Sequence, residues 1–155
     1  MGHPGLAVTT FALVLLIGGP FSEEFGWRGY MLPVLSGWLG WRKASLIIGV
    51  VWGIWHAPLF LIAGAPQAEM PFVLFLAGTI AMSVAFARLA VNTRFSVLPS
   101  IVLHWPINAW AWAVPVTPQG GTLQPYVLVI GVLCLIAAVI FLKPGPRASS
   151  GNPRQ

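Results

Sequence analysis

The chain has 155 residues, of which 7% are charged and 57% belong to the hydrophobic set AVILMFWYC. Soluble domains carry about 25% charged residues, so this composition excludes an ordinary soluble domain and indicates one domain embedded in a membrane. The formal net charge is +5, but the basic residues are not gathered on one face, so we expect no nucleic-acid partner.

Five apolar segments predict an all-α, polytopic transmembrane bundle of about five spans with a polar pocket between helices. The first segment covers residues 6–31, with a kink at Gly18-Gly19-Pro20. Residues 32–43 are rich in Pro, Gly and Trp, which is typical of an interfacial connection. The remaining predicted spans are residues 44–62, 71–91, 97–114 and 125–142.

Two regions follow from these spans. Residues 1–142 are expected to form the transmembrane domain, whose motif core covers about residues 20–112. Residues 143–155 are polar and predict a disordered cytoplasmic tail.

The basic residues predict the orientation. The connections after the first and third predicted spans, together with the tail, hold all eight Lys and Arg residues. The connections at 64–70 and 115–124 hold a single charge, Glu69. Because positive residues favour the cytoplasmic side, we expect an integral, multi-pass protein of a bacterial plasma membrane with its C-terminus in the cytoplasm.

The acidic residues mark the first candidate site. The chain has only three, and two of them, Glu23 and Glu24, are adjacent. An ionisable group at membrane depth costs about 2.5–3.5 kcal/mol, so this pair is expected to be functional. Arg28 lies four residues after Glu24, which favours an ion pair on a helix and leaves Glu23 without a local partner. A solvated helix end at the membrane surface is the alternative.

Two apolar segments carry the other polar side chains. His56 lies inside the second predicted span, and His104 and Asn108 share one face of the fourth. Pro58 and Pro106 each follow a His by two residues, which predicts a bend at each position. A lone His in a span is often a structural hydrogen-bonding group. Two such His residues together with Asn and a Glu pair indicate a hydrolytic pocket instead.

These side chains suit two kinds of hydrolytic chemistry. Glu23, His56 and His104 are plausible ligands for a catalytic zinc ion. Without a metal, a glutamate acts as general base on water, one histidine shares that work, and the His104–Asn108 pair donates to the developing oxyanion. The sequence has no HExxH motif, so the spacing of these residues does not decide between zinc-dependent and metal-free hydrolysis.

The polar residues resemble the motifs EExxxR, FxxxH and HxxxN of the CPBP family, which contains the type II CAAX prenyl endopeptidases and the Abi self-immunity proteins. The resemblance covers about residues 20–112. The matching residues are Glu23, Glu24, Arg28, Trp52, His56, His104 and Asn108. Trp52 stands where Phe is usual in the second motif. Family members usually carry further helices before the first motif, so we expect a truncated or shortened member.

The resemblance implies an intramembrane endopeptidase that hydrolyses a peptide or lipid-modified protein substrate near the cytoplasmic face of the lipid bilayer. It implies that Glu23 and His56 activate the water. The family has been described both as metalloproteases and as glutamate-type enzymes that need no metal, so a zinc ion stays open.

The resemblance assigns supporting roles to the other motif residues. Glu24 and Arg28 would orient and balance Glu23, while His104 and Asn108 would stabilise the oxyanion. A non-catalytic immunity or partner-binding protein of the same fold is one alternative. A small transporter or proton relay is another, although the sequence lacks the internal repeat that many transporters have.

Overall fold

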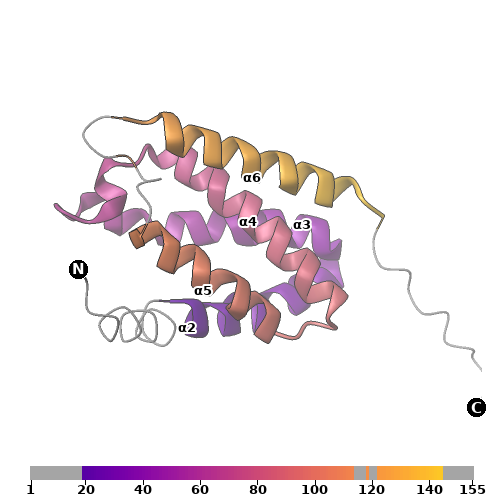
Figure 1. Ribbon diagram of the computed structural model, residues 1–155. Coiled ribbons are helices and arrows are strands. Elements are labelled where there is room, and N and C mark those ends of the chain that lie inside the picture. The colour runs from indigo at the N-terminus through magenta and orange to yellow at the C-terminus, as the bar shows by residue number, and fades with distance from the viewer. Residues whose placement is uncertain (1–18, 114–117, 119–121, 145–155) are drawn as a thin grey trace, which may run out of the picture.

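In the part of the chain that the structure describes, the regular elements are helices, as predicted. The computed structural model describes residues 19–113, 118 and 122–144 (Figure 1). In chain order the elements are α2 (Pro20–Glu24), the π-helix η1 (Phe25–Met31), α3 (Leu32–Trp55), the 3-10 helices η2 (Ala57–Leu61) and η3 (Pro66–Glu69), α4 (Phe72–Asn92), α5 (Leu98–Ala113) and α6 (Gln124–Leu142). Most of the first predicted span lies outside the described residues, and its end is α2 and η1.

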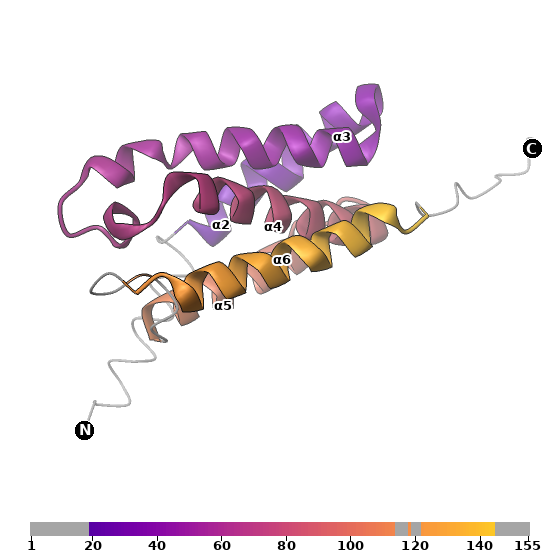
Figure 2. The same ribbon diagram turned by 90° about the horizontal axis from the view of Figure 1, so that it is seen from above.

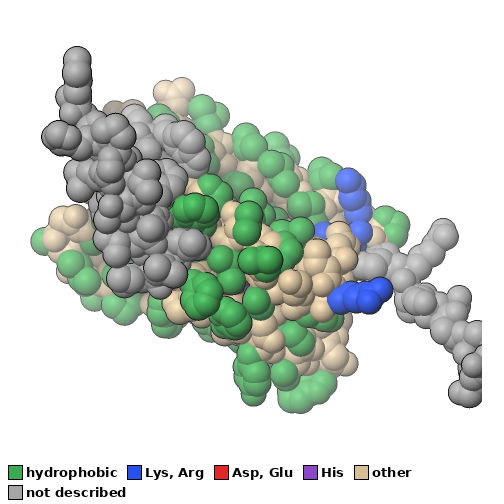
Figure 3. All heavy atoms as spheres, turned by 60° about the horizontal axis from the view of Figure 1, so that its bottom comes forward, with side chains coloured by type: hydrophobic (Ala, Val, Ile, Leu, Met, Phe, Trp, Pro, Cys, Tyr) green, Lys and Arg blue, Asp and Glu red, His purple; other side chains and the backbone are tan. Residues whose placement is uncertain are grey.

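The helices identify an integral membrane protein. Three helical stretches in the described part are long and apolar enough to cross a membrane: Pro20–Leu61, α4 and α6. The fourth predicted span is α5, whose 16 residues make it shorter than these. The described residues therefore provide three to four spans, compared with the five predicted for the whole chain. Hydrophobic side chains dominate the face in Figure 3, whereas Lys and Arg gather at one end.

The prediction of an interfacial connection over residues 32–43 is wrong. These residues belong to α3 and depart from helical geometry only at Gly40, where φ is 75° and ψ is 153°. A residue with a side chain rarely adopts such a φ, so one glycine is enough to redirect the helix. Pro33 lies in the first turn of α3, where proline is tolerated. The chain changes direction between two helical stretches of α3, one on each side of Gly40 (Figure 2).

The helix α4 lies at the centre of the bundle. It packs against α3 on one side and α6 on the other (Figures 1 and 2). The helix α5 lies beside α2 and also contacts α4. The first and fourth predicted spans, which carry the acidic pair and His104, are therefore neighbours although they are far apart in the sequence.

Small residues on α3 form its contact with α4. Ser45, Gly49 and Gly53 recur at four-residue intervals. The Ser83 hydroxyl of α4 donates to the Ser45 carbonyl over 2.8 Å, and the Thr79 hydroxyl donates to the Gly49 carbonyl over 3.2 Å. In a membrane, where lipid is as apolar as leucine, such close approach and interhelical hydrogen bonding hold helices together.

The Gly49→Ala substitution is expected to destabilise the bundle. A Cβ on Gly49 would lie 2.6 Å from the Cα of Ile80, so the two backbones would have to separate. Overpacking of this kind costs about 1–3 kcal/mol. Gly37→Ala is the matched control, because a Cβ there meets nothing within 4 Å. The apparent melting temperature in detergent should fall for Gly49→Ala alone. Equal melting temperatures for the two variants would contradict this packing.

Two arginines hold the end of α6. Arg42 of α3 donates from Nε to the Phe141 carbonyl over 2.7 Å and from Nη2 to the Lys143 carbonyl over 2.6 Å. Arg88 of α4 donates to the Pro144 carbonyl over 2.8 Å. The last carbonyls of a helix have no partner within the helix, so these guanidinium groups satisfy them. They also place basic residues of three segments at one end of the bundle.

Candidate active site

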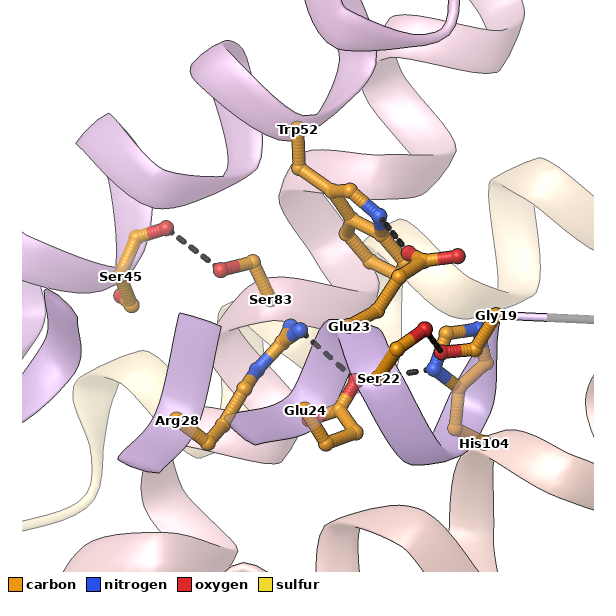
Figure 4. A network of polar contacts seen from close by, with 9 residues as sticks. All are labelled: Gly19, Ser22, Glu23, Glu24, Arg28, Ser45, Trp52, Ser83 and His104. Carbon is orange, nitrogen blue, oxygen red and sulfur yellow. Dashed lines mark hydrogen bonds and ion pairs between the residues drawn. The ribbon is translucent and has the colours of Figure 1, made fainter. Parts of the chain in front are cut away.

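Glu24 is the centre of the candidate site. Its side chain is fully buried, and its Oε1 atom lies 2.9 Å from Nη1 of Arg28 and 2.8 Å from Nδ1 of His104. The ion pair with Arg28 that the spacing predicts is present. His104, 80 residues away in the sequence, binds the same carboxylate oxygen (Figure 4). The residues of the first and third motifs therefore meet inside the protein.

An unusual helical turn carries the first motif. The helix α2 begins at Pro20, a favoured first helical residue, with Gly19 before it. From Phe25 to Met31 the helix widens into η1, which closes with a hydrogen bond from the Leu32 N–H to the Trp27 carbonyl. Such π-helical turns are frequent at functional sites. They are difficult to predict from sequence, where this segment reads as an ordinary helix.

Arg28 is buried, with 1% of its surface exposed. Its guanidinium carbon lies 4.8 Å from the ring centroid of Trp52 and 4.6 Å from that of Phe86. A cation held over aromatic faces and paired with a carboxylate is stabilised away from water. Arg28 was counted among the basic residues that indicate the cytoplasmic side. Its side chain lies within the site, and the orientation stays a prediction.

Glu23 is half-buried and does have a partner. Its Oε2 atom accepts a hydrogen bond of 2.6 Å from the indole N–H of Trp52 (Figure 4). This partner comes from the second motif, which is why the sequence around Glu23 gave no sign of it. Trp52 is the residue around which all three motifs gather, since its ring also lies 5.3 Å from the His104 ring and 6.0 Å from the His56 ring.

His56 lies at the end of α3 and not inside a helix as predicted. The helix stops at Trp55, and the chain continues as η2. Pro58 cannot donate to the carbonyl four residues before it, so a helix ends readily at this point. The ring Nδ1 lies 2.8 Å from the Trp52 carbonyl. A carbonyl only accepts, so Nδ1 carries the proton and Nε2 of the neutral ring offers a lone pair.

His104 and Asn108 lie on α5, which runs through Pro106 as one helix. His104 is 3% exposed, and Asn108 is half-buried one helical turn later. The Glu24 carboxylate accepts the Nδ1 proton of His104. The Nε2 atom then carries a proton only when the ring is an imidazolium.

The predicted zinc ligands are Glu23, His56 and His104. Within the part of the chain that the structure describes, no three His, Cys, Asp or Glu residues lie together as a group able to hold a metal ion. One oxygen of Glu23 binds Trp52, and Nδ1 of His104 binds Glu24. The zinc alternative therefore stays a prediction, and the metal-free chemistry is developed below.

Sequence reasoning missed two contributions to the site. Phe86 on α4 is 1% exposed and packs against both Arg28 and His104. The centroids of the Phe86 and His104 rings are 5.7 Å apart. Nothing distinguishes it from other apolar residues in a membrane helix. Trp52 was noted as a large aromatic residue of the second motif. Its role as a hydrogen-bond donor to Glu23 becomes visible only when the helices are placed together.

Comparison with known proteins gives consistent results. The family model described as type II CAAX prenyl endopeptidase Rce1-like matches residues 5–110. The chain is 29% identical over 136 residues to a curated protein named CAAX prenyl protease 2 from Methanococcus maripaludis. That alignment covers 84% of this chain and 48% of the relative, so the chain spans about half the relative's length. No solved structure was found to match the chain.

Proposed function

Because the chain belongs to the Rce1-like family of type II CAAX prenyl endopeptidases, we propose that it is an intramembrane endopeptidase. The observation that carries this proposal is the buried Glu24 carboxylate, which joins Arg28 to His104 beside Glu23. A structural bundle has no need to place two adjacent carboxylates, one of them fully buried, at membrane depth, given what an ionisable group costs there. The family match includes every one of the motif residues.

Glu23 is the proposed general base. Its Oε2 atom is held by Trp52, and the carboxylate takes a proton from a water molecule whose oxygen then attacks the carbonyl carbon of the scissile peptide bond. The Nε2 lone pair of His56 is the second acceptor for that water. General-base catalysis by a positioned side chain contributes about 10²–10⁴-fold.

His104 and Asn108 are the proposed donors to the oxyanion. Glu24 holds the His104 ring through Nδ1, and the protonated ring can then donate from Nε2 to the tetrahedral intermediate. The Asn108 amide adds a second donor. One such donor is worth about 10²–10³ in turnover. When the carbon–nitrogen bond breaks, the leaving amine takes the proton from Glu23. The products are a carboxylate and an amine.

The proposed substrate is a peptide or a lipid-modified protein that reaches the site from the membrane. The relative is named a CAAX prenyl protease, so peptides with and without a prenyl group should be compared. Purified protein in detergent should cleave members of a peptide library, with the products identified by mass spectrometry. Binding of peptides without cleavage of any of them would instead favour the non-catalytic, partner-binding alternative.

The proposed cleavage near the cytoplasmic face depends on the orientation of the chain. Arg42 and Arg88 lie at the end of the bundle where α6 finishes, and basic residues favour the cytoplasmic side. A reporter fused to the C-terminus should therefore read as cytoplasmic. A reporter inserted within residues 64–70 should read as external. The reverse pattern would contradict both the orientation and the cytoplasmic access of the substrate.

A further inference from the structure

Trp52 occupies the position at which the FxxxH motif has Phe, and this difference has a chemical consequence. Phenylalanine has no hydrogen-bond donor, whereas the indole N–H of Trp52 donates to Oε2 of Glu23 over 2.6 Å. An indole can only donate, so the carboxylate is the acceptor. This is the hydrogen bond that the structure gives to the Glu23 side chain.

The indole is itself held firmly. Trp52 is 2% exposed. The centroid of its ring lies 6.2 Å from that of Phe86, 5.3 Å from that of His104 and 4.8 Å from the guanidinium carbon of Arg28. A donor locked by packing on several sides holds its acceptor in one place. The position of the carboxylate is therefore set by the core of the bundle and not by the flexible Glu23 side chain alone.

Gly19 makes room for the other oxygen of the same carboxylate. Its φ of 105° is one that residues with a side chain rarely adopt. A Cβ built on Gly19 would collide with Oε1 of Glu23. The Gly19 carbonyl also accepts the Glu23 N–H over 2.7 Å, which fixes the backbone of Glu23 at the start of α2.

We propose that Trp52 is a positioning residue for the Glu23 carboxylate, whose Oε2 it binds while Gly19 leaves space for Oε1. This inference rests on the proposed function, in which Glu23 is the base. One carboxylate oxygen, Oε2, is bound by Trp52, and the other, Oε1, points toward Gly19, where no side chain stands in its way. The general base is thereby preorganised before the substrate enters.

The hydrogen bond is tested first, without any activity. A ¹H–¹⁵N spectrum of the protein in detergent should contain indole N–H signals from its eight tryptophans, and Trp52→Phe identifies the one from Trp52. A bond to a carboxylate moves that signal downfield, so Glu23→Ala, which removes the acceptor, should return it toward the others. A Trp52 signal that is unchanged by Glu23→Ala would overturn the inference, whether or not the protein is a protease.

The positioning role is tested by kinetics on a peptide that the wild type cleaves. Trp52→Phe should lower kcat by about 10- to 100-fold, the range for a hydrogen bond to a charged group, and should leave KM unchanged. Trp38→Phe is the matched control, because Trp38 is 80% exposed. An unchanged or raised kcat in Trp52→Phe would overturn the role. Failure of the wild type to cleave any peptide would instead overturn the proposed function.

A second variant disturbs the carboxylate without touching the indole, in case Trp52→Phe does not fold. Gly19→Ala should lower kcat in the same way and should also move the Trp52 indole signal. Gly40→Ala controls for the strain of a positive φ, because Gly40 has a φ of 75° and a Cβ there meets nothing within 4 Å. Equal effects of the two glycine variants on kcat would show that backbone strain, and not the position of the Glu23 carboxylate, lowers kcat. That result would overturn the positioning role of Trp52.

Discussion

The Glu23→Gln variant is expected to lower the rate of peptide cleavage by about 10²–10⁴-fold with little change in stability. Glutamine keeps the shape of the side chain, and its amide oxygen can still accept the N–H of Trp52, but it cannot take a proton from water. The loss should appear in kcat, measured on any peptide that the wild type cleaves.

The third acidic residue supplies the control for this experiment. Glu69 is exposed in η3, so Glu69→Gln removes one negative charge from the chain without touching the site. Its kcat should match that of the wild type, and both variants should keep the wild-type melting temperature. Full activity of Glu23→Gln would show that Glu23 is not the base.

The Glu24→Gln variant is expected to destabilise the protein by about 3–5 kcal/mol, because it leaves the buried Arg28 without its carboxylate partner. The loss should be seen as a lower melting temperature in detergent and lower yield. The same change removes the anchor of His104, so any folded fraction should also cleave slowly.

A double variant separates these two effects. Replacing the ion pair by Glu24→Gln together with Arg28→Met removes the uncompensated charge, so the melting temperature should recover at least in part. Cleavage should remain slow, because His104 still lacks the carboxylate that holds its ring in place. A single Glu24→Gln variant that is as stable as the wild type would contradict the buried ion pair.

Membrane helices were the most predictable part of the fold, since long apolar segments have few alternatives at membrane depth. The predicted span 71–91 and the observed Phe72–Asn92 differ by one residue at each end. Residues 32–43 were misread because their Pro, Gly and Trp residues are typical of a connection. Only Gly40 has a positive φ in this segment. Nothing in the sequence distinguishes it from Gly37, which is helical.

A proline follows each of the two histidines at the same spacing, but the helix ends before one of these prolines and continues through the other. His56 and His104 are each followed by Pro two residues later, and a bend was predicted at both positions. The helix α5 continues through Pro106, whereas α3 ends before Pro58. The difference comes from the surroundings. The helix α5 packs against α2 and α4, while the chain after His56 leaves α3 for the connection to α4.

The candidate site was predictable only in its local contacts. The spacing of Glu24 and Arg28 indicated their ion pair, because residues four apart are neighbours on a helix. The contacts of Glu24 with His104 and of Glu23 with Trp52 join helices that are distant in sequence. Without placing the helices, the sequence could not show which glutamate pairs with which partner. The family motifs brought these residues to attention but did not indicate that Trp52 is a donor.

We have proposed that this buried cluster hydrolyses a peptide bond with water and without a metal. The most direct measurement is cleavage in H₂¹⁸O by protein treated with a chelator, followed by mass spectrometry of the products. The metal-free mechanism predicts that cleavage persists and that one ¹⁸O atom enters the new carboxyl group. Loss of cleavage on chelation and its return with zinc would contradict the claim, and would make Glu23, His56 and His104 metal ligands.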